Sequence, residues 1–99
     1  MARLSDRDVQ DILDLLENEV NSLSRLSSVE RMKMRSKVRR QSTWLLEWND
    51  PSAENILQKL QWRLADLFLV CQRGFCDSLL RLLEDKARRL SFAKKKSMR

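Results

Sequence analysis

Histidine and tyrosine are absent from this sequence, and glycine and proline occur only once each. Because histidine is the commonest general base and the commonest metal ligand, its absence excludes Ser-His-Asp and Cys-His catalysis and any metal site built on histidine. Glycine and proline are the main residues of tight turns, so a fold of many short strands is excluded as well. The chain is expected to consist of a few long elements and to have no enzymatic activity.

Long hydrophobic segments are also missing. No stretch of about 18 apolar residues, the length that a membrane-spanning helix needs, occurs in the chain. The N-terminal residues MARLSDRDVQDI contain no apolar segment of the kind found in signal peptides. We therefore expect a protein that is neither secreted nor membrane-spanning, with a cytoplasmic or nuclear location.

Two cysteines, Cys71 and Cys76, are five positions apart. Without histidine or further cysteines they cannot complete a zinc site of four ligands, and no metal ion or cofactor is expected. The simplest interpretation is that both are small core residues in a reducing compartment. A disulfide between them would require a sharp turn of the backbone at Gly74.

Apolar residues recur in three segments at alternating spacings of four and three, and in a fourth segment at helical spacing with one adjacent pair; this is the pattern of helices that bury one face. The rows are Val9, Leu13, Leu16, Val20 and Leu23; Met34, Val38, Gln41, Leu45 and Trp48; Ala53, Leu57, Leu60, Leu64, Leu67 and Cys71; and Cys76, Leu79, Leu80, Leu83, Ala87 and Leu90. Gln41 is the one polar member, and it either fixes the register of the helices or lies at the edge of the face.

Residues that begin and end helices divide this pattern into four segments. Helix-start signals, each a capping residue with a suitable partner, occur at Ser5, Ser27 and Asp50, and Gly74 is suited to a helix end. The sequence therefore predicts one all-α domain over residues 1–92, with helices near 5–26, 28–48, 51–73 and 75–91, followed by a basic C-terminal tail over 93–99.

Four helices of about 20 residues with short connections favour an antiparallel four-helix bundle. A long helical hairpin that completes its core by dimerisation is the alternative, so a homo-oligomer stays open at this point. A six-helix death-type fold matches the length of the chain, but it needs shorter helices and more breaks than the sequence indicates.

Residues 28–42 carry six basic side chains and one acidic side chain, Glu30. Their helical spacing places the basic residues in two adjacent rows, which is a candidate surface for the phosphate groups of a polyanion. The residues of this candidate polyanion-binding surface are Arg31, Lys33, Arg35, Lys37, Arg39 and Arg40. The alternative is structural: the preceding helix is acidic, and its carboxylates would pair with these cations and select the antiparallel neighbour.

Residues 86–99 carry seven basic side chains and no acidic one, and no acidic helix is adjacent in the sequence to neutralise them. The candidate cations here are Arg88, Arg89, Lys94, Lys95 and Lys96. We interpret this segment as a nuclear-import or nucleic-acid-binding tail, as an anionic-lipid anchor with Phe92 in the interface, or as a solubilising tail. Ser42 and Ser91 each follow a pair of arginines and are candidate phosphorylation sites, where a phosphate would reduce the positive charge.

Three tryptophans, Trp44, Trp48 and Trp62, flank the predicted turn at Asp50 and Pro51. They fill one end of the core in the structural interpretation and anchor a partner helix in the functional one. The sequence favours a non-enzymatic helical interaction or adaptor module that binds a helical segment of a partner protein. Nucleic-acid binding through residues 28–42 and the tail is the alternative, and binding to an anionic membrane surface is the third; no small-molecule substrate is expected.

Overall fold

The computed structural model describes the backbone of residues 3–97 and the side chains of residues 3–90. Within this range every regular element is an α-helix, which confirms the all-α class predicted from the sequence. The helices are α1 (Asp6–Ser22), α2 (Ser28–Arg39), α3 (Ser42–Leu46), α4 (Ala53–Arg63), α5 (Ala65–Val70) and α6 (Phe75–Ser97).

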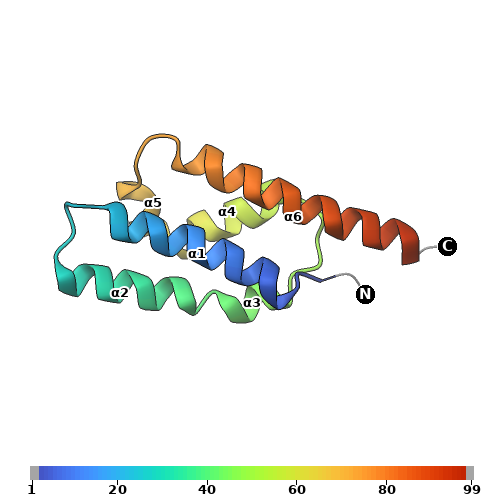
Figure 1. The fold of residues 1–99 in the computed structure, drawn as a ribbon, viewed down its shortest axis with the longest axis horizontal. Helices are drawn as coiled ribbons and strands as arrows, with labels where there is room; N and C mark the ends of the chain where they lie inside the picture. The colour runs from blue at the N-terminus through green and yellow to red at the C-terminus, as the bar shows by residue number, and fades with distance from the viewer. Residues whose placement is uncertain (1–2, 98–99) are drawn as a thin grey trace.

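The long helices lie roughly along one axis of a body that measures 52 × 24 × 20 Å (Figure 1). α1 packs against α2, α3 and α6, while α4 packs against α6 and α5. The chain reverses after α1, after α3 and after α5, so α1 and α6 run in opposite directions and the two ends of the chain lie at the same end of the molecule (Figure 1). α1 and α6 therefore form the central pair, to which α2–α3 and α4–α5 are attached.

Local signals predicted two helix starts correctly. The Ser5 hydroxyl accepts a hydrogen bond from the Asp8 N–H at 3.1 Å, and the Asp8 carboxylate accepts one from the Ser5 N–H at 3.2 Å, which makes a capping box at α1. Ser27 and Glu30 form the same pair of bonds at α2. The break predicted at Gly74 is confirmed: this residue has a φ of 89°, in the region that favours glycine, and α6 begins directly after it.

Two other boundaries differ from the prediction. The first helix ends at Ser22 instead of residue 26, because Leu23 takes an extended conformation with φ −82° and ψ 95° and is buried there. α4 is capped by Ser52 instead of Asp50, because the Ser52 hydroxyl accepts the Asn55 N–H at 3.3 Å. The Asp50 carboxylate accepts a hydrogen bond from the side-chain amide of Asn55 at 2.7 Å.

The helices predicted over 28–48 and 51–73 are each divided in two. At the first division Gln41 is buried, and its side-chain amide donates to the Lys37 carbonyl at 2.7 Å, so this residue belongs to the core instead of the edge. Its backbone N–H bonds three residues back instead of four, which interrupts the α-helix. At the second division Leu64 has φ −118° and ψ 40°, outside the helical region. Neither division carries a glycine or proline signal.

The C-terminal segment is more regular than predicted. α6 continues through Ser97, so the segment predicted as a tail over 93–99 is helical in the part that the structure describes. Alanine and lysine are good helix formers, and cations near the C-terminal end of a helix interact favourably with its dipole.

The helices differ greatly in how much apolar surface they bury. Leu16 and Val20 of α1 are completely buried, as the heptad spacing predicted, and so is Ile12 beside this row. In α2 only Val38 is buried. α1 is therefore the centre of the core, whereas α2 is attached to it by few apolar contacts.

The cysteines do not behave as a pair of core residues. Cys71 is half-buried and Cys76 is exposed, and both are free thiols. Phe75 takes the core position at the start of α6, which turns the next residue toward solvent. The core interpretation is therefore wrong for Cys76.

Candidate functional site

Ion pairs between α1 and α6 occupy two basic residues of the C-terminal segment, Lys86 and Arg89. Lys86 has only 4% of its side chain exposed, and its ammonium group lies 2.6 Å from the Asp11 carboxylate and 3.1 Å from the Asp8 carboxylate. Arg89 lies 3.1 Å from the same oxygen of Asp8. The expectation that no acidic helix neutralises the basic C-terminal segment is wrong for Lys86 and Arg89, because the chain reversal brings α6 alongside α1.

This cluster shifts the pKa values of Asp8 and Lys86 toward their charged forms. Burial opposes ionisation of Asp8, but hydrogen bonds from Ser5 and Lys86 and the charge of Lys86 outweigh it and lower the pKa of Asp8 below its ordinary value. Burial also opposes the charge on Lys86, but the hydrogen bonds and charges of Asp11 and Asp8 raise its pKa. The cluster is therefore a network of ion pairs at neutral pH.

Most basic side chains of α2 form no ion pair with the acidic residues of α1. Among the side chains of residues 3–90, Arg39 is the one basic residue of α2 that forms an ion pair with α1, with its Nε 2.8 Å from Glu17. Arg35 and Arg31 donate hydrogen bonds to uncharged oxygen atoms of α1 and of the residue that follows it, at 3.3 and 3.0 Å. The structural interpretation of the basic stretch, neutralisation by the preceding helix, thus holds for a single pair.

The other candidate cations have different surroundings. Lys37 forms an ion pair at 3.0 Å with Asp66 of α5. Lys33 on α2, Arg40 directly after α2 and Arg88 on α6 are exposed and form no ion pair with the side chains that the structure describes. Four further candidates lie outside the described side chains, namely Ser91, Lys94, Lys95 and Lys96.

Two of the three tryptophans make contacts within the chain. Trp44 and Trp48 are half-buried, and their rings contact each other edge to face with centroids 5.6 Å apart. The indole N–H of Trp44 donates to the side-chain oxygen of Gln41 at 2.6 Å, and that of Trp48 donates to the Asp50 carbonyl at 2.6 Å. Both rings therefore help to hold the α3–α4 connection in place.

Trp62 is different, because 75% of it is exposed. Leu60 and Leu64 occupy the core side of this part of the chain, and Trp62 is two positions from each of them, on the opposite side of α4. The ammonium group of Lys59 lies 5.1 Å from the centroid of the Trp62 ring. A shallow groove of about 520 Å³ runs beside it, lined by Trp48, Asp50, Asn55, Gln58, Lys59 and Trp62.

Three features join α2–α3 to α4–α5 along one line. The groove brings Trp48 to the N-terminal half of α4, the Arg63 guanidinium lies 5.2 Å from the Trp44 ring centroid, and Lys37 pairs with Asp66. These contacts follow one another in order because the two segments run in opposite directions (Figure 1). We call the following residues the aromatic–basic seam: Lys37, Trp44, Trp48, Lys59, Trp62 and Arg63.

Sequence reasoning missed Lys59, Arg63 and Leu69 as surface residues of interest. Leu69 of α5 is 83% exposed, the highest value among the large apolar side chains of the described part. It lies on α5, beyond the break at Leu64, whereas Trp62 lies on α4. Trp62 was a candidate partner anchor from the sequence. The signal that could have identified Leu69 is its position two residues after Leu67, a buried member of the predicted apolar row.

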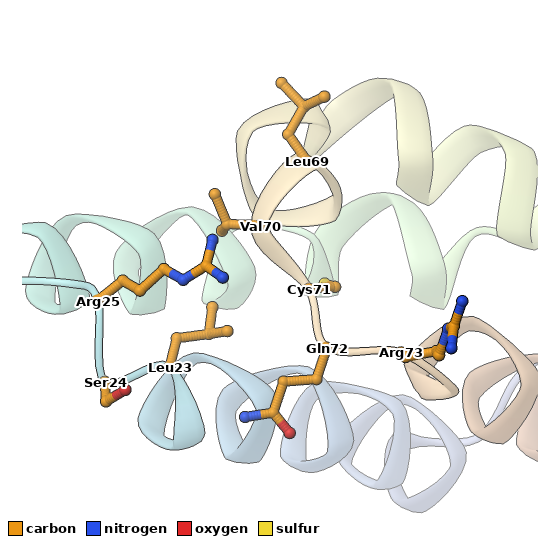
Figure 2. Close-up of a pocket in the computed structure, with 8 residues that line it drawn as sticks. All are labelled: Leu23, Ser24, Arg25, Leu69, Val70, Cys71, Gln72 and Arg73. Carbon is orange, nitrogen blue, oxygen red and sulfur yellow. The ribbon is translucent and has the colours of Figure 1, made fainter.

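A second hollow, of about 370 Å³, lies between the α1–α2 and α5–α6 connections (Figure 2). Figure 2 shows the Arg25 side chain directed across it toward Val70, while Leu69 points away. The backbone N–H of Gln72 donates to Glu19 at 2.8 Å, and its side-chain amide donates at 3.3 Å to the last carbonyl of α1. These bonds fasten the α5–α6 connection to α1, so we assign this hollow a structural role.

The Cys71 thiol at this hollow is not a reactive group. It donates a hydrogen bond to the Leu67 carbonyl at 3.0 Å. Burial, together with the nearby Glu19 and Cys76, raises the pKa of the Cys71 thiol to about 12. Because the thiolate is the nucleophilic form, this residue is inert near neutral pH.

Comparison of the chain with models of protein families, with curated proteins and with solved structures finds no match. Across the described residues, no helix combines the length and the apolar character that crossing a membrane requires. The same residues contain no group of three or more His, Cys, Asp or Glu side chains that could hold a metal ion. A function must therefore be argued from the surface itself.

Proposed function

We propose that this protein is a non-enzymatic interaction module that binds an acidic, amphipathic helix of a partner protein along the aromatic–basic seam. The observation that carries the proposal is the exposure of Trp62 beside Lys59, a cation without a carboxylate partner among the described side chains, together with the exposure of Leu69 on the adjoining α5. Large apolar side chains that stay in water at one place on a small domain mark an interaction surface.

Trp62 and Leu69 supply the apolar anchor points. Trp62 lies on α4 and Leu69 on α5, on either side of the division at Leu64, so they offer two separate contacts to a partner helix whose own apolar residues recur at positions i, i+3, i+4 and i+7. Tryptophan is enriched among the residues that dominate binding energy. The groove between Trp48 and Trp62 gives the partner's apolar side chains a surface to enter.

The charges around these anchors favour an acidic partner. Lys59 and Arg63 lie against indole rings and form no ion pair with a described carboxylate. Lys33 on α2 and Arg40 directly after it also form no ion pair with a described carboxylate. Asp66 is the one acidic residue paired across the seam. Complementary charge speeds association and selects among partners more than it adds affinity.

The proposal is tested with a synthetic acidic peptide of about 20 residues that has leucines at positions i, i+3, i+4 and i+7 and glutamates between them. Binding is measured by fluorescence anisotropy near physiological salt, with a scrambled peptide of identical composition as the reference. Trp62→Ala is expected to weaken binding by about 2 kcal/mol, and Leu69→Ala by about 1 kcal/mol.

Leu46→Ala is the matched control, because Leu46 is an exposed apolar residue of α3 two positions from Trp44 and thus on the opposite side of that helix. It is expected to leave binding unchanged. Equal binding of the scrambled peptide, or equal losses from Leu46→Ala and Trp62→Ala, would contradict the proposal.

Nucleic-acid binding is the second candidate, and the unpaired Lys33 and Arg40 favour it. Labelled single- and double-stranded oligonucleotides are therefore titrated at two salt concentrations. Binding that falls steeply with salt and ignores Trp62→Ala would make a polyanion the ligand of this surface. Binding to an anionic membrane surface, the third candidate, is tested by the same titrations with vesicles that contain anionic lipid.

We further propose that α2 with α3, and α4 with α5, each act as one segment, so that the chain forms an antiparallel four-helix bundle complete as a monomer. In support, Ile56, Leu60, Leu79 and Leu83 are completely buried within a single chain. Sedimentation equilibrium is expected to give the monomer mass of 11.8 kDa, and a dimer would favour the hairpin alternative. The two free thiols are in keeping with a cytoplasmic or nuclear location.

A further inference from the structure

We infer that Ser36 is a phosphorylation site whose phosphate switches off the binding of acidic partners to α2 and the aromatic–basic seam. The effect on partner binding rests on the proposed function, whereas the modification and its effect on the charge of α2 do not.

Ser36 lies at the centre of the basic surface of α2. Its side chain is exposed and makes no hydrogen bond with the residues that the structure describes. Lys33, three residues before it, and Arg40, four residues after it, share its side of the helix. Arg35 and Lys37 flank it in the chain, so the segment carries positive charge on both sides of the hydroxyl. A kinase with an acidic substrate groove selects this arrangement by charge complementarity.

The serine that the sequence singled out on the same segment is less suitable. Ser42 is half-buried at the start of α3. It lies four residues after Val38 and three before Leu45, both completely buried, so its register is that of the core side. A phosphate there would disturb packing, whereas a phosphate on Ser36 enters solvent.

α2 also has few buried contacts that oppose its local opening to a modifying enzyme. A kinase must bind the residues around its serine in an extended form, so the helix has to unfold locally. Val38 is the one buried residue of α2, and segments with few buried apolar contacts open at low cost in free energy. Opening of α2 leaves the central α1–α6 pair in place.

The chemistry needs only a nucleoside triphosphate and a protein kinase. The Ser36 hydroxyl oxygen forms a bond to the γ-phosphorus as the bond to the β-phosphate oxygen breaks, and the nucleoside diphosphate and the hydroxyl proton leave. The phosphate carries a charge of about −1.5 to −2 at neutral pH. This cancels the two positive charges of Lys33 and Arg40, which have no other ion-pair partner among the described side chains.

Arg40 is placed so that a phosphate on Ser36 would neutralise its charge directly. An acidic group four residues before a basic one is the favourable orientation for a pair within a helix. The phosphate on Ser36 would therefore pair with Arg40 and occupy the cation that an acidic partner would otherwise contact. One modification is enough to remove the excess charge of this side of α2.

In the test, the full chain is incubated with a basophilic protein kinase and Mg²⁺-ATP, and the modified residue is identified by peptide mass spectrometry. Binding of the acidic peptide and the salt concentration of elution from heparin are then measured for modified and unmodified protein. Ser36→Ala treated with the kinase controls for other sites. Ser36→Asp is compared with Ser78→Asp, which adds the same charge at an exposed position of α6.

Phosphate on Ser36, an affinity for the acidic peptide lowered about tenfold or more, and earlier elution from heparin are the expected results, with kinase-treated Ser36→Ala and Ser78→Asp unchanged. Absence of phosphate on Ser36, or its presence without effect on heparin elution, would overturn the inference. If unmodified protein does not bind the acidic peptide, the proposed function fails, and the heparin measurement still decides whether Ser36 controls the charge of α2.

Discussion

Replacement of Lys86 by methionine tests the buried ion pairs that join the two central helices. Lys86 lies between Asp11 and Asp8, and 4% of its side chain and 9% of that of Asp8 are exposed. Methionine has a similar length and fills much of the same space, but it carries no charge. The variant therefore leaves the carboxylate of Asp8 buried without its main partner.

The expected loss in the free energy of unfolding follows from the interactions that Asp8 retains in the variant. Removal of one partner from a buried ion pair costs about 3–5 kcal/mol. Asp8 retains Arg89 and its bond from the Ser5 N–H, so we expect the lower end, about 3 kcal/mol. Asp11→Asn is the matched comparison: its side chain is 41% exposed and Lys86 keeps Asp8 as a partner, so we expect a smaller loss than for Lys86→Met.

Urea denaturation measures both variants, since a change in midpoint at constant slope is a change in stability alone. A Lys86→Met variant that loses less than about 1 kcal/mol, or no more than Asp11→Asn, would refute the reasoning.

The pKa shifts of Asp8 and Lys86 determine how the stability of the protein depends on pH. The pKa of Asp8 is lowered, so its contribution to stability is present above the ordinary value of 3.8 and is lost as pH falls through the lower folded-state pKa. The pKa of Lys86 is raised, so its contribution is present below 10.5 and is lost as pH rises through the higher folded-state pKa. Lys86→Met is expected to flatten the alkaline limb, which stability curves against pH measure directly.

Three further predictions concern the core and the α5–α6 connection. Leu16→Ala, at a completely buried position of α1, is expected to cost about 2–5 kcal/mol in urea denaturation, and a loss below about 1 kcal/mol would mean that α1 is not central. Gly74→Ala is expected to cost about 1–2 kcal/mol from its positive φ alone, because an added Cβ meets no atom within 4 Å; a neutral result would contradict this backbone conformation. Iodoacetamide at about pH 8 is expected to modify Cys76 much faster than Cys71, because Cys76 is exposed and the Cys71 thiol has a pKa of about 12. Equal rates of modification would show that the α5–α6 connection is open.

Features set by neighbouring residues were predictable from the sequence. The capping boxes at Ser5 and Ser27 need only a serine and a carboxylate three positions later, and both occur as predicted. The buried row of α1 follows from its spacing for the same reason. The divisions at Gln41 and Leu64 were not predictable, because they depend on how the ends of two segments meet across the core and carry no local signal.

The candidate site was also predictable only in the features that depend on local sequence. Composition identified the cations of α2 and the three tryptophans, but pairing depends on which helices become neighbours in space. α6 returns alongside α1 and pairs with Asp8 and Asp11, whereas Lys33 and Arg40 form no ion pair among the described side chains. Trp62 looks like a core residue from its type, and only its position two residues from Leu60 identifies it as exposed.

The indole N–H signals of the three tryptophans offer the most direct measurement of the central claim. In a ¹H–¹⁵N spectrum of the labelled chain, the acidic amphipathic peptide is added stepwise and the three indole signals are followed. The account predicts a large shift for exposed Trp62 and smaller shifts for Trp44 and Trp48, whose N–H groups are held by Gln41 and Asp50. An unchanged Trp62 signal, with backbone shifts confined to α1 and α6, would contradict binding at the aromatic–basic seam.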